Sequence, residues 1–570
     1  MDSSEIRRFI LLFALAFVGL LLYQAWMRDY GARTPLAPIS TAAQPPEAAS
    51  IPVTPAMPLS NVEPQGTEQI PIETSRIADF VTVETDVLRV EISTRGGTLE
   101  NLHLLRYPLT TEQPEIKFQL FKPHEPNFYV AQSGLIAGKN EPAPTDTAMF
   151  TVDKPKYVLT PGTDKFNVDL TWSNALGIKM IKRFIFTRNS YLIELNQIIE
   201  NTTAAAWSAR AYVQLQRSKP IESEEASFAK AYNGTAYYNA KEKFEKISFD
   251  DIAKTQLANK TMSDGWIAMV QHHFISAWVI DKTTGNTGDK TLYTNKYPNV
   301  RYAIGMYSPP IKVAPGQTFV FTDKLFVGPK LQNHLAAIAP GLDLTVDYGW
   351  LTVIAQPIFW LLDQLHYLFG NWGWAIIFLT VLIKVAFYKL SESSYKSMAD
   401  MRKLTPKLQE VKDRYGDDTE RLNQAMMDLY RKEKINPLGG CLPIVVQIPV
   451  FIALYWVLLE SVEMRQAPFA LWINNLSAPD PYFILPLIMG ISMFVQQQLN
   501  PAPMDPIQAK VMMGMPLIFT IFFAFFPSGL VLYWVVNNLL SIAQQWYIVR
   551  AVENAEVDKQ RSGAKFNRSK

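Results

Sequence analysis

Five long apolar segments occupy the last third of the chain, and they restrict its fold more than any other feature. Long runs of apolar residues with few charges predict helices that cross a membrane. The segments are Trp372–Tyr388, Leu442–Leu459, Tyr482–Val495, Val511–Phe526 and Leu530–Ile548. At ~1.5 Å per residue the third and fourth reach only about 21 and 24 Å, against a hydrocarbon core of ~30 Å. Either the bilayer thins around them, or their helices extend further, for example into Gln496–Gln498.

A sixth apolar segment, Phe9–Met27, lies near the N-terminus and follows two arginines. A cleaved signal peptide needs small residues after a shorter apolar stretch, whereas residues 23–27 (YQAWM) are mostly bulky. We therefore predict an uncleaved membrane anchor. Nine prolines between Pro35 and Pro71, mixed with Ala, Ser, Thr and Gln, then predict an extended tether.

The middle of the chain changes to an apolar pattern with a period of two. Leu88, Val90 and Ile92 alternate with polar residues, and the run 166–172 (FNVDLTW) repeats this alternation. Glycine-rich turn signals separate such runs. A period of two is typical of strands with one buried face, so the pattern predicts a large antiparallel β domain, most simply a sandwich.

The composition excludes several classes of enzyme. The 54 basic and 52 acidic residues nearly balance, so the chain as a whole shows no bias toward nucleic acid. The single cysteine, Cys441, rules out an intramolecular disulfide and multi-cysteine zinc sites. His272 and His273 would point to opposite faces of a strand and could not share a metal ion. None of the common nucleotide-binding, metalloprotease or serine-hydrolase motifs occurs. We therefore expect no enzymatic activity, no metal and no cofactor.

Basic residues in the loops predict the orientation in the membrane, because cytoplasmic loops are enriched in Lys and Arg. The loop 391–437 has ten Lys/Arg, the loop 460–481 has only Arg465, and residues 550–570 have six. Six spans with both termini in the cytoplasm satisfy this bias. The β domain then lies on the other side of the membrane.

Lys384 lies inside the first of the five apolar segments. An ammonium group in a span costs roughly 2.5–3.5 kcal/mol on insertion scales, which makes it a candidate functional group. The alternative is that its long side chain extends to nearby water. Asn537, Ser541 and Gln544 share one face of the last span. Polar groups on several spans favour a hydrated cavity, although such groups also join helix to helix. The candidate lining residues are Lys384, Thr380, Gln447, Thr520, Asn537 and Ser541.

Two further helical regions accompany the spans. Leu351–Leu368 mixes large apolar residues with Asp363 and His366, which is typical of a helix lying in the membrane interface. The loop 391–437 has apolar residues spaced by three or four, interrupted at residues 416–418 (GDD). This spacing predicts a helical hairpin, and ten basic and nine acidic residues predict that it is exposed.

Three stretches resemble the YidC membrane-protein insertases, in the long Gram-negative form with a large periplasmic domain. They are residues 436–443 (NPLGGCLP), 467–472 (APFALW) and 526–533 (FPSGLVLY). The pattern covers residues 371–550 well, and residues 265–269 (GWIAM) match in the β domain. The resemblance implies a polytopic α-helical membrane protein with six transmembrane helices, a five-helix insertase core and a periplasmic all-β domain similar to a supersandwich.

The resemblance also implies a hydrophilic groove that is open to the cytoplasm and to lipid but closed to the periplasm. Family members usually place an arginine in this groove, and the matching residue here is Lys384, which keeps the charge but lacks the planar fork. Tyr533 and Trp534 would contribute to the groove, and Trp534 stands where close relatives often have a second tyrosine. Lys389 replaces a common proline.

The implied organisation has six parts. They are an anchor (1–30), a Pro-rich periplasmic linker (31–76), a periplasmic β domain (77–346), an interfacial helix (347–370), a five-helix insertase core (371–550) that includes the cytoplasmic hairpin 391–437, and a basic cytoplasmic tail (551–570).

The implied function is insertion and folding of proteins in the bacterial inner membrane, alone or with the Sec translocon. The expected partners are nascent membrane-protein substrates, the Sec translocon, the lipid bilayer and, through the cytoplasmic loops and basic tail, the ribosome. No ATP is required, because each Leu, Ile, Phe or Val contributes ~0.3–0.6 kcal/mol to insertion. A transporter that uses Lys384 would predict inverted repeats, which the five spans lack. A Ser–Lys membrane protease is a second alternative, with Ser391 and Ser393 as its candidate serines.

Overall fold

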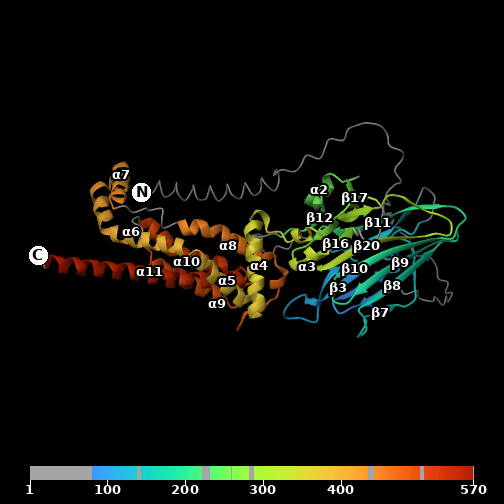
Figure 1. The fold of residues 1–570 in the computed structure, drawn as a ribbon, viewed down its shortest axis with the longest axis horizontal. Helices are drawn as coiled ribbons and strands as arrows, with labels where there is room; N and C mark the ends of the chain where they lie inside the picture. Colours follow the sequence, from blue (N-terminus) through green and yellow to red (C-terminus); the bar gives the residue numbers. More distant parts are fainter. Residues whose placement is uncertain are drawn as a thin grey trace, which may run out of the picture. The chain divides into compact units, whose positions relative to one another are not determined.

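The computed structural model describes residues 80–137, 143–220, 231–257, 260–280, 288–416, 418–433, 442–500 and 506–568. The predicted anchor and linker lie outside the described residues, as do residues 436–441 of the first family-like stretch. The described chain forms two compact units (Figure 1). One is a β unit that ends at Asp347 and also includes Glu460–Glu463. The other is a helical unit formed by Tyr348–Leu459 and the residues from Met464 onward.

The β unit contains two large sheets. An 11-stranded sheet has the order β14-β17-β18-β11-β5-β3-β2-β1-β7, with β19 paired to β11 and β4 to β3. Its strands are β14 (Lys260–Met262), β17 (Lys290–Tyr297), β18 (Arg301–Tyr307), β11 (Trp207–Ser218), β5 (Tyr129–Ala137), β3 (Leu99–Pro108), β2 (Leu88–Ser93), β1 (Phe80–Glu84), β7 (Lys156–Val158), β19 (Ile311–Val313) and β4 (Lys117–Phe121).

The second sheet has nine strands, in the order β13-β12-β15-β16-β20-β10-β9-β8-β6. They are β13 (Lys243–Ile247), β12 (Gly234–Asn239), β15 (Trp266–Val270), β16 (Phe274–Ile280), β20 (Thr318–Pro329), β10 (Leu192–Asn201), β9 (Ile178–Thr187), β8 (Lys165–Ser173) and β6 (Thr151–Val152). Two short helices, α2 (Phe249–Lys254) and α3 (Gln332–Ile338), complete the unit.

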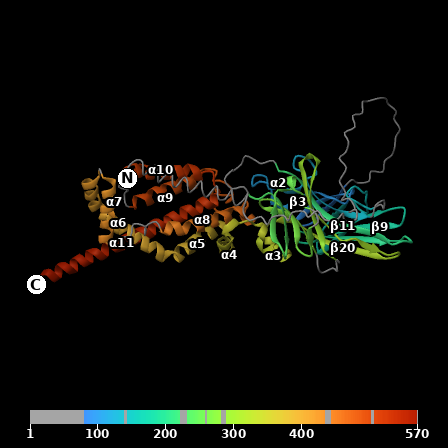
Figure 2. The ribbon, with the colours of Figure 1, turned by 90° about the horizontal axis from the view of Figure 1, so that it is seen from above.

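The two sheets pack face to face, which confirms the predicted sandwich (Figure 2). Leu88, Val90 and Ile92 of β2 are all buried, as their alternation predicts. Contacts also cross between the sheets: the Lys182 ammonium on β9 donates hydrogen bonds to Ser133 O at 2.7 Å and to Ser133 Oγ at 2.9 Å on β5. The described strand pairs are antiparallel except β1 with β7, so the predicted antiparallel domain is correct in nearly every pair.

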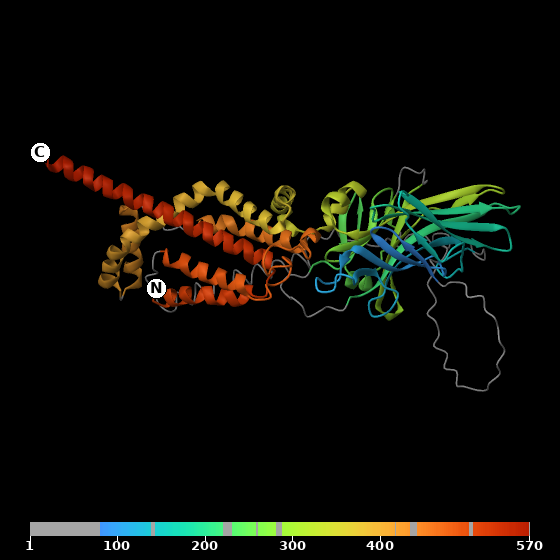
Figure 3. The same ribbon diagram turned by 90° about the horizontal axis from the view of Figure 1, so that it is seen from below.

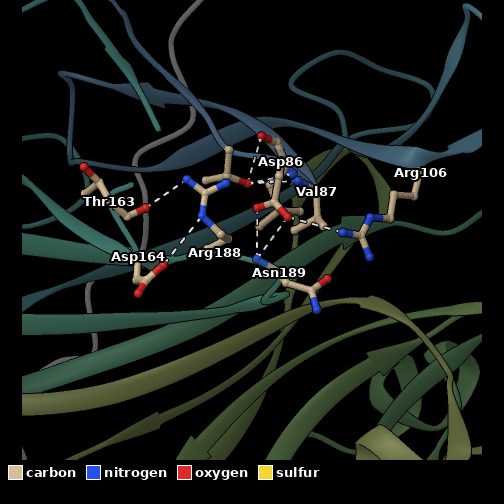
Figure 4. Close-up of polar contacts among 9 residues, drawn as sticks. Asp86, Val87, Arg106, Thr163, Asp164, Arg188 and Asn189 are labelled. Atoms are coloured by element: carbon tan, nitrogen blue, oxygen red, sulfur yellow. Dashed lines mark hydrogen bonds and ion pairs between the residues drawn. The ribbon is translucent and has the colours of Figure 1, made fainter. Parts of the chain in front are cut away.

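Polar contacts join turns from the two sheets at one end of the sandwich (Figure 4). The Asp86 carboxylate, between β1 and β2, accepts hydrogen bonds from the Asn189 backbone N–H at 2.9 and 3.1 Å. Asn189 has a φ of 53°, a left-handed conformation that Asn tolerates better than most residues. Arg106 approaches Asp86 at 3.3 Å, and Arg188 donates to Thr163 O at 2.9 Å. Exposed ion pairs contribute little free energy of folding. The main effect of these contacts is therefore on the geometry of the turns.

The two adjacent histidines do not lie on a strand, so that expectation is wrong. His272 and His273 lie between β15 and β16, and their rings stack with centroids 3.8 Å apart. In the short turn of a hairpin, successive side chains need not alternate between faces as they do along a strand. No group of three or more potential metal ligands occurs among the described residues, whose gaps include residues 221–230 and 281–287.

The helical unit follows the predicted segments closely. Its helices are α4 (Thr352–Phe369), α5 (Trp372–Ala386), α6 (Tyr388–Tyr415), α7 (Thr419–Lys432), α8 (Leu442–Glu460), α9 (Ile484–Gln498), α10 (Pro506–Phe523) and α11 (Ser528–Arg568). Within the described ranges, no helix alone is long and apolar enough to qualify as a membrane span, but α5 and α6 qualify together, with a bend of 67° between them. Val446–Glu460, Ile484–Gln498 and Ala509–Phe523 are shorter apolar helices.

Helices α9 and α10 run side by side, as the orange-red helices in Figures 2 and 3 show. A Cβ atom on Gly490 would lie only 1.9 Å from Thr520 Oγ1, so glycine permits this close approach. Leu487 and Ile491 on α9, and Leu517 on α10, are more than half exposed. An exposed apolar face of this kind fits contact with lipid.

The predicted hairpin and the helix before the first apolar segment also form. In the hairpin, Leu404 and Leu408 of α6 and Leu422 of α7 are buried, and the Asp418 side chain caps α7 by accepting from the Arg421 N–H at 3.1 Å. In α4, Leu362 is fully buried whereas Tyr367 is 90% exposed. This two-sided character is typical of a helix in the membrane interface.

Candidate functional site

Lys384 lies in the last turn of α5, close to the bend before α6. The Asn371 side chain begins this helix by accepting from the Trp374 N–H at 3.2 Å. The Lys384 side chain is half-buried, and its Nζ donates a hydrogen bond to Ser541 Oγ of α11 at 2.7 Å. No charged group among the described residues is close enough to pair with it. The ammonium therefore has a neutral partner inside an apolar helical unit.

The polar face predicted for the last span leads from Lys384 into the unit. Ser541 Oγ donates to Asn537 O, one turn earlier in α11, at 2.7 Å. The Asn537 side-chain Oδ1 accepts from Gln447 Nε2 of α8 at 2.8 Å. Gln447 Nε2 also lies 3.5 Å from the Tyr533 hydroxyl. Five of the eight predicted groove residues thus form one connected set across α5, α8 and α11.

The other three predicted residues lie outside this connected set. The Thr380 hydroxyl is buried and donates to Ile376 O of its own helix at 2.7 Å. Thr520 likewise donates to Pro516 O at 2.7 Å and packs against Gly490. Trp534 packs against Phe451 and Phe523, with ring centroids 4.9 and 5.6 Å away. Thr380 and Thr520 are therefore occupied by local contacts that a count of polar residues does not reveal.

Two residues of α6 join the site: Tyr395, which the sequence did not single out, and Ser391, which it named only as a candidate serine of a Ser–Lys protease. The Tyr395 phenol forms a hydrogen bond with the Ser541 side chain, which opposes the rise in the pKa of Tyr395 caused by burial. Ser391 lines a recess of about 10 Å³ beside Lys384, together with Gln447 and apolar residues. That volume holds about one water molecule. Ser391 and Tyr395 are four residues apart, so both lie on one face of α6. This spacing is the sequence signal that could have identified them.

A compact loop before α9 covers the N-terminal ends of α9 and α11. The buried Asp480 carboxylate accepts hydrogen bonds from Trp472 Nε1 at 3.1 Å, from the Tyr482 N–H at 3.0 Å and from the Leu485 N–H at 2.7 Å. The Ser528 N–H, at the start of α11, donates to Ala478 O at 2.7 Å. A Cβ atom on Gly373 would lie 1.9 Å from the Phe469 ring, so the loop packs tightly on α5. Phe469 and Trp472 of the APFALW stretch and Ser528 of the FPSG stretch therefore take part in this packing.

Comparison with known proteins shows that this chain is an inner-membrane protein with a periplasmic domain. The family model described as the YidC periplasmic domain matches residues 80–361, and the one described as the 60Kd inner membrane protein matches residues 364–555. The membrane protein insertase YidC of Methylococcus capsulatus is 51% identical over 96% of this chain and 98% of its own. That of Nitrosococcus oceani is 48% identical over 96% and 99%. The chain therefore belongs to the YidC family of membrane protein insertases.

One solved structure is also similar. The crystal structure titled an active YidC insertase with its first transmembrane domain resolved is 19% identical. The match covers 84% of this chain and 94% of that one, with a TM-score of 0.39.

Proposed function

We propose that the chain inserts proteins into the bacterial inner membrane through the Lys384 site. The observation that carries this proposal is the Lys384 ammonium, which lies in an apolar helical unit and has only a neutral hydrogen-bond partner among the described residues. A buried cation of this kind is costly, and such groups usually mark a functional pathway. An uncompensated ammonium group attracts carboxylates, so an acidic residue in a translocated tail is its natural ligand.

The proposed steps require no nucleotide. A nascent substrate enters from the cytoplasmic side, where the hairpin α6–α7 lies in the predicted topology. Lys384 attracts acidic residues of the translocating segment, and the polar groups of Gln447, Asn537 and Ser541 lower the cost of moving it. The apolar helix of the substrate then leaves into lipid, driven by its own transfer free energy.

The predicted topology and partners belong to the same proposal. The anchor and five core helices make six spans, with both termini in the cytoplasm and the β domain in the periplasm. The strong excess of Lys and Arg in residues 391–437 and 550–570 supports this orientation. The ribosome would contact the hairpin and basic tail, and the Sec translocon would cooperate with the insertase on larger substrates.

Substitution of Lys384 tests the site. We expect Lys384→Arg to retain insertion, Lys384→Ala to weaken insertion of substrates with acidic tails, and Lys384→Glu to be worst. A charge pair at ~4 Å is worth about 1 kcal/mol in water and about 4 kcal/mol at an effective dielectric constant of ~20, so the alanine variant should lose between roughly fivefold and several hundredfold. Protease protection of matched acidic-tail and neutral-tail substrates in depleted cells measures this loss. Wild-type protection of both tails by Lys384→Ala would show that Lys384 merely extends toward water.

One distance favours a second candidate function, a Ser–Lys protease. Ser541 Oγ lies 2.7 Å from Lys384 Nζ, which is dyad distance. Ser541 is only 3% exposed, however, and its hydroxyl donates its hydrogen to Asn537 O rather than to the lysine. A nucleophile needs an accessible oxygen and a base that accepts its proton. Labelling of Ser541 by a fluorophosphonate would support the protease, and absence of labelling in an insertion-competent preparation would exclude it.

A further inference from the structure

Ser541 is the point where three helices meet around the Lys384 charge. Its hydroxyl lies against Lys384 Nζ of α5, against the Tyr395 phenol of α6 and against the Asn537 carbonyl of its own helix α11. A serine hydroxyl has one hydrogen to donate and two lone pairs that accept. The hydrogen goes to Asn537 O, and a lone pair of the same oxygen accepts from Lys384 Nζ. Ser541 therefore acts toward Lys384 as an acceptor only.

The lysine, in contrast, is only partly satisfied among the residues that the structure describes. An ammonium group has three donors, and one of them is spent on Ser541. The recess beside it is lined by Ser391, Gln447 and apolar side chains. Because a hydroxyl carries no charge, the bond to Ser541 fixes the direction of the ammonium group without neutralising it. A carboxylate at the same position would compensate the charge permanently.

We propose that Ser541 is the positioning residue that keeps the Lys384 charge oriented and uncompensated, and that the site therefore selects carboxylates of the substrate. The Tyr395 phenol of the hairpin helix lies against the same side chain. Selectivity for acidic segments thus depends on residue 541 being neutral as much as on residue 384 being basic. This inference rests on the proposed function of Lys384.

The test installs a carboxylate beside the lysine. Ser541→Asp supplies a permanent negative charge beside the lysine. Ser541→Asn is the matched control, because asparagine has nearly the same size as aspartate and no charge. We expect Ser541→Asp to lower the ratio of acidic-tail to neutral-tail insertion to that of Lys384→Ala. Ser541→Asn should keep the wild-type ratio, whatever its total activity. Protease protection in depleted cells gives the readout, and the neutral tail together with the membrane abundance of each variant reports folding.

A charge exchange keeps the proposal testable if both Ser541 variants fail to accumulate. Lys384→Ser combined with Ser541→Lys returns the ammonium group to the same place from the opposite helix. Recovery of acidic-tail insertion relative to Lys384→Ser alone supports the inference, and no recovery overturns it.

The outcomes separate this inference from the proposed function. If Lys384→Ala inserts acidic tails like the wild type, the proposed role of Lys384 fails and the inference fails with it. If Lys384→Ala is defective but Ser541→Asp and Ser541→Asn behave alike on both tails, only the inference about Ser541 is overturned.

Discussion

At the scale of single residues, one fully buried and one half-buried lysine show how surroundings decide what a charge does. Lys182 on β9 is fully buried and donates to Gly96 O at 2.5 Å as well as to Ser133, so its donors are occupied by the fold. Lys384 donates once among the described residues. The burial of Lys182 could be predicted, because it shares the inward parity of Ile178, Met180 and Phe184 along its strand. The acceptors of its hydrogen bonds could not be predicted, because Gly96 and Ser133 belong to the other sheet and are distant in sequence.

Lys182 predicts a pH dependence of stability. Burial lowers its pKa from the ordinary value of 10.5 to about 7. Between these two values the unfolded chain binds a proton that the folded chain does not, so stability rises as the pH increases from about 7 to about 10. We expect Lys182→Met to flatten this rise. Thermal unfolding of the purified full-length protein in detergent, followed at several pH values for both proteins, measures it. Parallel pH profiles of the two melting temperatures would contradict the prediction.

At the scale of secondary-structure elements, the apolar segments predicted the helices well and their ends less well. The segment Tyr482–Val495 became α9 (Ile484–Gln498), so the extension into Gln496–Gln498 is real. Asp480 sets the start of this helix through bonds to the Tyr482 and Leu485 N–H groups, which depend on a folded loop. The segment Val511–Phe526 became α10 (Pro506–Phe523). Helix ends depend on tertiary contacts of this kind, and hydropathy carries no information about them.

The contact between α9 and α10 gives a prediction with a matched control. Gly490→Ala places a methyl group 1.9 Å from Thr520 Oγ1, so either the Thr520 side chain must rotate or the helices must separate. Rotation breaks the hydrogen bond from Thr520 Oγ1 to Pro516 O and separation loosens the helix contact, so the protein should be destabilised by about 1–3 kcal/mol as for other overpacked contacts. Gly514 on α10 meets nothing within 4 Å, so Gly514→Ala should be neutral or stabilising by up to ~1 kcal/mol.

Melting temperatures in detergent compare the two alanine variants. The double variant Gly490→Ala with Thr520→Ala should recover part of the loss, because it removes the clashing oxygen. Equal stability of Gly490→Ala and Gly514→Ala would show that the α9–α10 contact is looser than described.

At the scale of the whole molecule, the division into a β unit and a helical unit followed from the change of apolar period in the sequence. One detail did not: Glu460–Glu463, directly after the apolar part of α8, folds with the β unit. There Lys330 Nζ donates to Glu460 Oε2 at 3.3 Å and to Thr345 O at 3.2 Å, and both charged side chains are almost fully buried. No local pattern predicts a pair of residues that lie 130 positions apart.

This ion pair predicts where the β unit can be removed. Deletion of residues 80–329 keeps Lys330 for Glu460, and no connected residue of the Lys384 site is lost, so most insertion activity should survive. Deletion of residues 80–347 also removes Lys330. Both deletions remove most of the β unit that buries this pair, and exposed ion pairs contribute about 0–1 kcal/mol, so the longer deletion should accumulate only slightly less. Equal activity of both deletions, at equal membrane abundance, would show that the pair is dispensable.

The small volume of the recess beside Lys384 has a consequence for the energy supply of the cell. The recess has space for about one water molecule and is bounded in part by apolar residues such as Ile383, Phe387 and Val446, so the recess by itself offers no continuous file of waters. A charged site inside the bilayer that was filled with a continuous file of waters would conduct protons or ions across the membrane. We therefore expect the resting protein to hold the Lys384 charge without dissipating the proton gradient across its membrane.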